Sequence, residues 1–131
     1  MNIALPQMCE SYLPIEGLWI VTFIRGSGGG SITGTAVFRD ELVLGGDNER
    51  CYIGEYRTTD AAIEGKIDLP LHTQIKEPSC FFGNVQEPVV SFSLKREREG
   101  IFGYIGDAEI QNAVDVCRSF TIALQRAYRL D

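Results

Sequence analysis

The sequence predicts a small all-β domain of antiparallel strands, and three observations support this prediction. Short segments rich in β-branched and aromatic residues recur along the chain. Several of them alternate between apolar and polar residues, as half-buried strands do. Turns rich in Gly, Asn and Asp separate them, and about eight strands at this spacing are typical of an antiparallel sandwich or a closed barrel. The length of 131 residues suits a single domain with one core.

The first half of the chain divides into a lead-in and five expected strands. Residues 1–16 form either a short helix or an irregular arm that covers part of the first strand or one barrel end. From residue 17 the period-two pattern begins, so we expect one β-domain over residues 17–131. Its first strands are expected at 17–25, 32–39, 42–44, 51–58 and 62–69, joined by the Gly-rich segment 26–31, a tight turn at 40–41 and a dense turn at 45–48.

The second half is less regular. Residues 80–85 predict a short strand, residues 89–96 a clearly alternating one, and residues 101–105 another. Residues 109–117 form either a further strand or a wide connection. We expect a final strand over residues 119–128, although good helix formers at 123–127 leave a helix as the alternative.

The first strand is apolar on both faces. Trp19, Val21 and Phe23 share one face, while Leu18, Ile20 and Ile24 share the other with Thr22. Leaving the second stripe in water forfeits roughly 25 cal/mol per Å² of apolar surface. Three arrangements are compatible with this pattern: the N-terminal arm covers the stripe, a second subunit covers it, or neither does. If a second subunit covers the stripe, Ile20→Glu would place a charge in that interface and produce a monomer.

Composition argues against a nucleic-acid partner and against a metal site. The net charge is −6 and the pI about 4.8, whereas binding to phosphates requires a basic face. The most basic run, residues 95–99, is interrupted by Glu and indicates a solvated hairpin end. The four cysteines, Cys9, Cys51, Cys80 and Cys117, lack the close spacing of zinc ligands, and His72 is the one histidine.

The N-terminus has no signal-peptide pattern and no segment resembles a membrane span. We therefore expect a cytoplasmic protein with free thiols.

No recognisable catalytic arrangement appears. We expect His72 to lie in an exposed loop, out of reach of a nucleophile. The run Gly28–Gly30 lacks the residues of a phosphate loop, and Ser27 lacks the setting of a nucleophile elbow. Glu55 is the one candidate for a carboxylate with a raised pKa, because it would be buried if its face pointed inward. We expect no enzymatic activity and no cofactor.

Four segments together resemble the GrlR-like family, whose members are negative regulators of type III secretion. They are residues 17–23 with their Gly-aromatic opening, residues 34–38, the Gly-Gly-Asp turn at 44–47 and the Tyr-x-Gly-x-Tyr strand at 52–56. The resemblance covers mainly residues 17–70. It implies a lipocalin-like (calycin-type) barrel of eight strands, often dimeric.

The resemblance also implies a function and a few contacts. The best-known family member represses transcription by sequestering an activator protein through alternating acidic residues in one loop. The matching loop here contains Thr59 and Asp60 and has a single acid. The Gly17-x-Trp19 opening resembles the lipocalin signature, which implies that Arg126 stacks on Trp19 at the barrel base; the alternative is that Trp19 is simply a core aromatic.

We therefore expect a regulatory module that binds a transcriptional regulator protein and forms a homodimer. The alternative is a carrier or sensor of a small, lipid-like amphipathic ligand. Small residues at positions 34, 36, 54 and 65 either leave room for that ligand or relieve crowding between curved strands. The residues expected to line the barrel interior in the carrier are Trp19, Phe23, Phe38, Tyr52, Tyr56 and Phe92.

Overall fold

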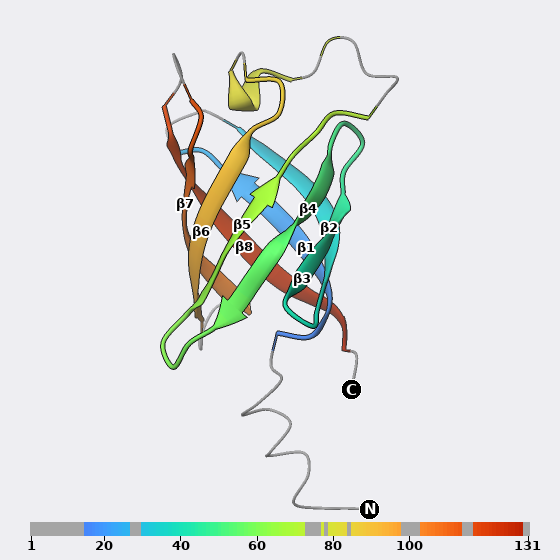
Figure 1. Ribbon diagram of the computed structural model, residues 1–131, viewed down its shortest axis with the longest axis vertical. Coiled ribbons are helices and arrows are strands. Elements are labelled where there is room, and N and C mark those ends of the chain that lie inside the picture. The colour runs from blue at the N-terminus through green and yellow to red at the C-terminus, as the bar shows by residue number, and fades with distance from the viewer. Residues whose placement is uncertain are drawn as a thin grey trace, which may run out of the picture.

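Eight antiparallel strands close into a barrel in chain order, with the last strand paired to the first (Figure 1). The computed structural model describes residues 15–26, 30–72, 77, 79–83, 85–97, 103–113 and 117–129. The strands are β1 (Gly17–Ile24), β2 (Ser31–Arg39), β3 (Leu42–Gly46), β4 (Cys51–Thr58), β5 (Ile63–Asp68), β6 (Val89–Arg96), β7 (Tyr104–Ile110) and β8 (Ser119–Arg129). This confirms the prediction of an all-β, antiparallel, eight-stranded barrel of lipocalin-like form.

Closure depends on the pairing of β1 with β8. Val21 lies opposite Leu124 and Phe23 opposite Ile122, with a register shift between Leu18 and Trp19. On its other side β1 pairs with β2 along its whole length. Because every strand then has two hydrogen-bonded neighbours, the sheet has no exposed edge at which another chain could add a strand.

Alternating side chains build the core, as the period-two patterns predicted. On β5, Ile63 and Ile67 are buried while Lys66 and Asp68 are exposed. On β8, the inward side chains Phe120, Ile122 and Leu124 are buried. The last segment is therefore a strand rather than a helix, because its inward side chains complete the core and its backbone pairs on both sides.

The tight turn predicted at 40–41 joins β2 to β3. Both central residues adopt positive φ, 54° at Asp40 and 66° at Glu41. Two such residues match the right-handed twist of the flanking strands, which suits a two-residue hairpin connection.

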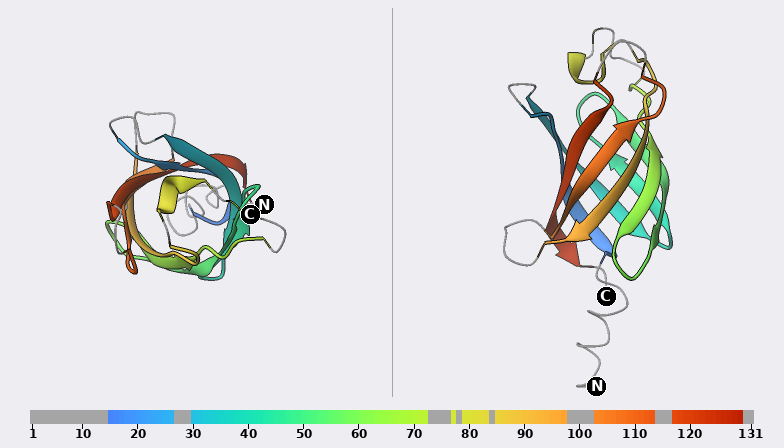
Figure 2. Two further views of the ribbon diagram at one scale, coloured as in Figure 1. Left: turned by 90° about the horizontal axis from the view of Figure 1, so that it is seen from above. Right: turned by 90° about the vertical axis from the view of Figure 1, so that its left-hand side faces the viewer.

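One predicted strand is wrong. In place of the strand expected at 80–85, Cys80–Phe82 forms a short 3-10 helix, η1. Phe81 and Phe82 are both buried against the same end of the barrel. A strand would direct these consecutive side chains to opposite faces, whereas a helical turn lets both point into the core. Seen along the barrel, η1 lies across its opening (Figure 2).

Two further boundaries differ from the prediction. Of the strand expected at 101–105, residues 101–102 lie outside the described residues, and the observed strand is Tyr104–Ile110. Of the segment expected as a strand or a wide connection at 109–117, residues 109–110 end β7 and residues 111–112 form a turn, while residues 114–116 lie outside the described part of the chain. Most of the predicted arm, residues 1–14, lies outside the described residues. No helix among the described residues is long and apolar enough to cross a membrane.

Strand curvature depends on glycine at inward positions, and Gly54 provides a test. A Cβ at this position would collide with the Lys66 carbonyl oxygen and the Ile67 side chain, whereas one at Gly26 would meet no atom within 4 Å. We expect Gly54→Ala to lower the free energy of unfolding by about 1–3 kcal/mol, because backbone atoms must shift. Chemical denaturation would measure this, with Gly26→Ala as the control. Equal stability of the two variants would contradict the close strand approach at Gly54.

Candidate functional site

The six residues expected to line the interior do lie there. Their exposed fractions range from 0% at Phe23 to 7% at Phe92, and Ala36 is also buried. Four of the six rings pack in two pairs, Phe23–Tyr52 and Phe38–Tyr56, each with centroids 5.3 Å apart. The residues are Trp19, Phe23, Phe38, Tyr52, Tyr56 and Phe92.

The interior is filled rather than hollow. The interior cavity bordered by Phe23, Phe38, Tyr52, Phe92 and neighbouring aliphatic side chains has a volume of about 20 Å³. That is room for roughly one water molecule, since a water needs about 10–15 Å³ by this measure, whereas small-molecule pockets hold roughly 300–1,000 Å³. The small residues serve close packing instead: a Cβ at Gly34 would strike the Tyr52 hydroxyl, and one at Gly65 would strike the Phe92 ring.

Trp19 and Arg126 close one end of the barrel, as the resemblance implied. The Arg126 guanidinium lies 4.1 Å from the centroid of the Trp19 ring, within range of a cation–π interaction. Trp19 Nε1 donates a hydrogen bond to the Ile15 carbonyl at 2.6 Å, and Arg126 Nη1 donates one to the Glu16 carbonyl at 2.7 Å. The chain entering β1 is therefore tied to the last strand.

The opposite end is closed by η1, which Arg25 holds in place. Arg25 donates from Nε and Nη2 to the Phe81 carbonyl at 3.0 and 2.9 Å, and from Nη1 to the Cys117 carbonyl at 2.8 Å. Its guanidinium also stacks on the Phe81 ring at 4.9 Å. The sequence alone did not identify Arg25, Phe81 or Phe82 as residues that close the barrel end. Their contacts depend on where the segment containing η1 folds back onto the barrel.

Arg50 secures the same end from the other side. Its side chain is buried, and Nη1 donates to the carbonyl oxygens of Leu69 and Gln86 at 2.8 and 2.9 Å. The guanidinium lies 5.0 Å from the Phe82 ring. Burial lowers the pKa of Arg50 from its usual value, while Glu49 and Asp47 oppose that shift. An arginine stays charged under such conditions, so this buried cation relies on carbonyl and ring contacts.

The turn predicted at 45–48 connects β3 and β4 and is organised by Asp47. Asp47 Oδ1 accepts hydrogen bonds from the backbone N–H groups of Glu49 and Arg50, at 2.7 and 2.8 Å. Tyr52 donates its hydroxyl hydrogen to Asp47 Oδ2 at 2.5 Å. Burial, followed by this hydrogen bond and the Asp47 charge, raises the pKa of Tyr52 well above its usual value of 10.0.

His72 lies in a loop as predicted, but the prediction that it is exposed and out of reach of a nucleophile is wrong. His72 is half-buried against the same turn, because Arg50 and Leu71 form an antiparallel bridge and the His72 N–H donates to the Glu49 carbonyl at 2.8 Å. The ring lies between two partners: Nε2 is 2.8 Å from the Asp47 carbonyl oxygen, and Nδ1 is 3.6 Å from Cys51 Sγ. Cys51, Cys80 and Cys117 are free thiols.

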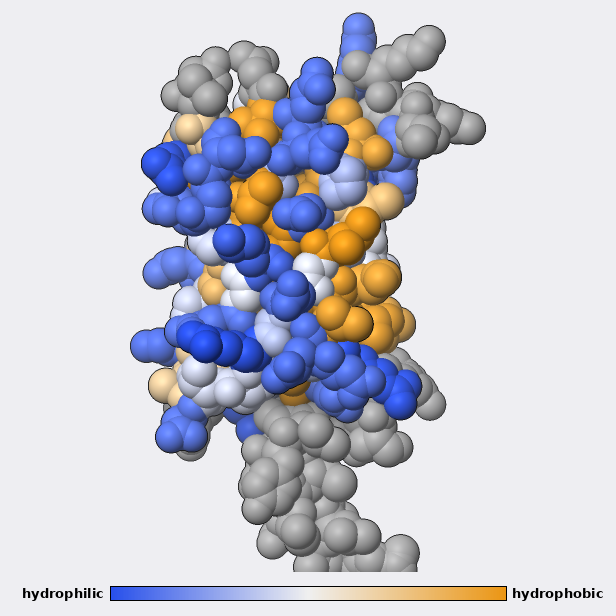
Figure 3. Space-filling model, in the orientation of Figure 1, coloured by the Kyte–Doolittle hydropathy of each residue, from blue (hydrophilic) through white to orange (hydrophobic). Residues whose placement is uncertain are grey.

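Apolar side chains cross the outer surface of four neighbouring strands. The strand registers place Leu18 opposite Val37, Val37 opposite Leu44, and Leu44 opposite Ile53. We call these four residues the apolar row. Leu44 and Ile53 are 54% and 49% exposed, and nearby Leu42 is 56% exposed. Figure 3 shows apolar surface gathered on this side of the molecule.

The outer face of β1 is less exposed than the sequence suggested. Leu18, Ile20 and Ile24 are each half-buried within the single chain. Because β1 lies between β2 and β8, side chains on both neighbours stand beside its outer face. The largest exposed aliphatic side chains in the described structure are instead on β3 and β4.

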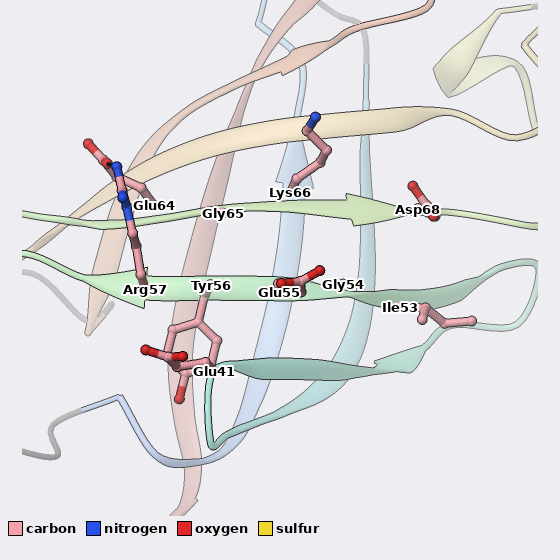
Figure 4. Close-up of a pocket in the computed structure, with 10 residues that line it drawn as sticks. All are labelled: Glu41, Ile53, Gly54, Glu55, Tyr56, Arg57, Glu64, Gly65, Lys66 and Asp68. Atoms are coloured by element: carbon pink, nitrogen blue, oxygen red, sulfur yellow. Dashed lines mark ion pairs between the residues drawn. The ribbon is translucent and has the colours of Figure 1, made fainter.

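A shallow, charged groove of about 680 Å³ lies beside the apolar row on β4 and β5 (Figure 4). Arg57 and Glu64 form an exposed ion pair across it at 3.6 Å, which contributes little stability. Glu55 is exposed on this outer face, so the possibility of a buried carboxylate there is excluded. The groove has four acidic and two basic side chains: Glu41, Glu55, Glu64, Asp68, Arg57 and Lys66.

The expected partner loop is a compact turn between β4 and β5. Thr59 Oγ1 accepts hydrogen bonds from the N–H groups of Ala61 and Ala62, at 3.3 and 3.0 Å. Asp60 is exposed at its tip. Thr59 thus stabilises the turn itself, and Asp60 is the charge that the turn presents to solvent.

No protein-family model matches the chain, and no curated protein matches it. The resemblance to the GrlR-like family therefore depends on the quoted segments alone. Within the described parts of the chain, no group of three His, Cys, Asp or Glu side chains is arranged to hold a metal ion.

The filled interior predicts that amphiphiles do not enter the barrel. Titration of the protein with fatty acids should leave the fluorescence of Trp19, the one tryptophan, unchanged. The reason is the residual volume of about 20 Å³, which is far below that of a fatty acid. Saturable quenching at one ligand per chain, or a lipid retained in native mass spectrometry, would contradict the filled interior.

The buried tyrosines predict a loss of stability in alkali. Burial raises the pKa values of Tyr52, Tyr56 and Tyr104 above 10.0 in the folded state. A raised folded-state pKa means that the stabilisation is complete below the unfolded value and declines as the pH rises above 10. Urea denaturation at a series of pH values should show this decline.

Tyr52→Phe is the matched variant for the alkaline prediction. It removes the hydroxyl bonded to Asp47, so it should cost about 1 kcal/mol at neutral pH. It should also reduce the decline above pH 10. An identical pH dependence in both proteins would show that Tyr52 does not contribute to it.

Proposed function

We propose that this chain is a non-enzymatic interaction module that binds a regulatory protein through the apolar row and the adjacent acidic groove. The exposure of Leu44 and Ile53 at the centre of the outer β3–β4 surface carries this proposal. Aliphatic side chains that remain half exposed on a folded domain are favourable anchors for a partner, because binding removes their apolar surface from water.

The filled interior favours a surface function. A residual volume of about 20 Å³ gives no support to a carrier of small molecules. The barrel walls also lack an open edge for strand addition. The outer faces of the strands and their loops are what remain available for recognition.

Charge favours a basic partner. The groove beside the row has four acidic and two basic side chains, and the whole chain carries a net charge of −6. A protein that binds DNA has a basic surface for the phosphates. An acidic, partly apolar surface on this chain would complement such a region and compete with DNA for it.

The resemblance to the GrlR-like family agrees with this choice of partner, since its best-known member sequesters a transcriptional activator. In that member an acidic loop makes the contact, whereas the matching loop here has Asp60 as its one acid. In the proposed complex the acidic groove on β4 and β5 takes the place of that loop.

The experiment uses Leu44→Thr combined with Ile53→Thr. Threonine is compatible with a strand and preserves the charge, so only the apolar anchors are removed. Affinity capture from the native host should yield a basic DNA-binding protein with the wild-type chain. With the purified pair, calorimetry should show that the double variant weakens binding roughly tenfold or more, while stability changes by less than about 1 kcal/mol.

Ile105→Thr on β7 is the control, because this aliphatic residue faces outward on the opposite side of the barrel and should leave binding unchanged. Equal binding by the double variant and the wild type would overturn the proposal. So would a homodimer in sedimentation that the double variant converts to a monomer, because the row would then belong to a second copy of this chain.

A further inference from the structure

A thiol and an imidazole come together at the end of the barrel closed by η1. Cys51 begins β4 and is half-buried, and its N–H donates to the Pro70 carbonyl at 2.9 Å. His72 follows the short bridge between Arg50 and Leu71. The bridge between Arg50 and Leu71 brings the two segments together and places His72 Nδ1 3.6 Å from Cys51 Sγ, although these residues are 21 positions apart in the sequence.

The surroundings of the imidazole determine which nitrogen carries the proton. Nε2 lies 2.8 Å from the Asp47 carbonyl oxygen, which can only accept a hydrogen bond. We therefore assign the hydrogen of the neutral ring to Nε2, which leaves the lone pair of Nδ1 directed to the Cys51 thiol. The Asp47 carbonyl thus orients the imidazole as a proton acceptor, in the arrangement that activates a nucleophilic thiol.

We propose that Cys51 is a site of thiol–disulfide exchange with low-molecular-weight disulfides, and that His72 accepts the thiol proton. Thiolate is the attacking species in this reaction, so a neighbouring base accelerates it. The half-buried position leaves part of Cys51 open to a small reagent.

The reaction balances without a further oxidant. Cys51 transfers its proton to His72 Nδ1, and the Cys51 sulfur attacks one sulfur of the disulfide. The S–S bond of the reagent breaks as the new S–S bond forms. The departing sulfur leaves as a thiolate and takes the proton from His72, so the products are a mixed disulfide on Cys51 and one free thiol.

The other described cysteines provide an internal comparison. Cys117 is exposed, and its thiol donates to the Ser119 carbonyl at 3.7 Å. A carbonyl oxygen orients the thiol but does not remove its proton. Cys80 is also exposed. If access alone determined the reaction rate, both would react faster than Cys51.

The test exposes the full-length protein to oxidised glutathione and follows each cysteine by mass spectrometry of its peptides. We expect Cys51 to form the mixed disulfide faster than Cys80 and Cys117 in the wild type. His72→Gln retains an amide that can donate to the Asp47 carbonyl but has no basic nitrogen. It should slow the reaction of Cys51 roughly tenfold or more and leave the other two unchanged.

Reaction of Cys51 at or below the rates of Cys80 and Cys117 in the wild type would overturn the proposal, and this comparison requires no variant. An unchanged Cys51 rate in a folded His72→Gln protein would also overturn it, because the imidazole would not then assist the thiol. Partner binding enters neither measurement, so the outcome is independent of the proposed interaction function.

Discussion

The pairing of β1 with β8 is the constraint on which the rest of the structure depends. It converts a chain of hairpins into a closed cylinder and directs one face of every strand to a common interior. Aromatic and aliphatic side chains then fill that interior and leave a cavity of about 20 Å³. Closure removes the open edge of the sheet, and the packed side chains occupy the centre of the barrel. The interaction proposed for this chain therefore uses the outer surface.

Arginine side chains secure both ends of this cylinder in the same physical way. Arg126 stacks on Trp19 at one end, while Arg25 and Arg50 stack on the η1 phenylalanines at the other. Each also donates to backbone carbonyl oxygens. The planar guanidinium suits this role because it bonds in its plane and stacks through its faces. The result is a barrel in which guanidinium contacts with aromatic rings and backbone carbonyl oxygens secure both ends.

The sequence predicted the features that depend on one strand at a time. Period-two alternation identified inward residues on β5, β6 and β8, and the Trp19–Arg126 contact followed from the family resemblance. Features that depend on the register between strands could not be read in this way. Leu44 and Ile53 form a surface only because they lie opposite each other, and Cys51 meets His72 only because Leu71 forms a bridge with Arg50.

On β4, Cys51 and Ile53 share the outer face, so the reactive thiol lies beside the apolar row.

Amide hydrogen exchange along β1 tests the central claim most directly. In a closed barrel, successive β1 amides donate alternately to β2 and to β8, and all those in the middle of the strand should be protected to a similar degree. If β1 were instead the edge of an open sheet, every second amide between Ile20 and Phe23 would exchange rapidly. Uniform protection supports the closed barrel, and an alternating pattern would contradict it.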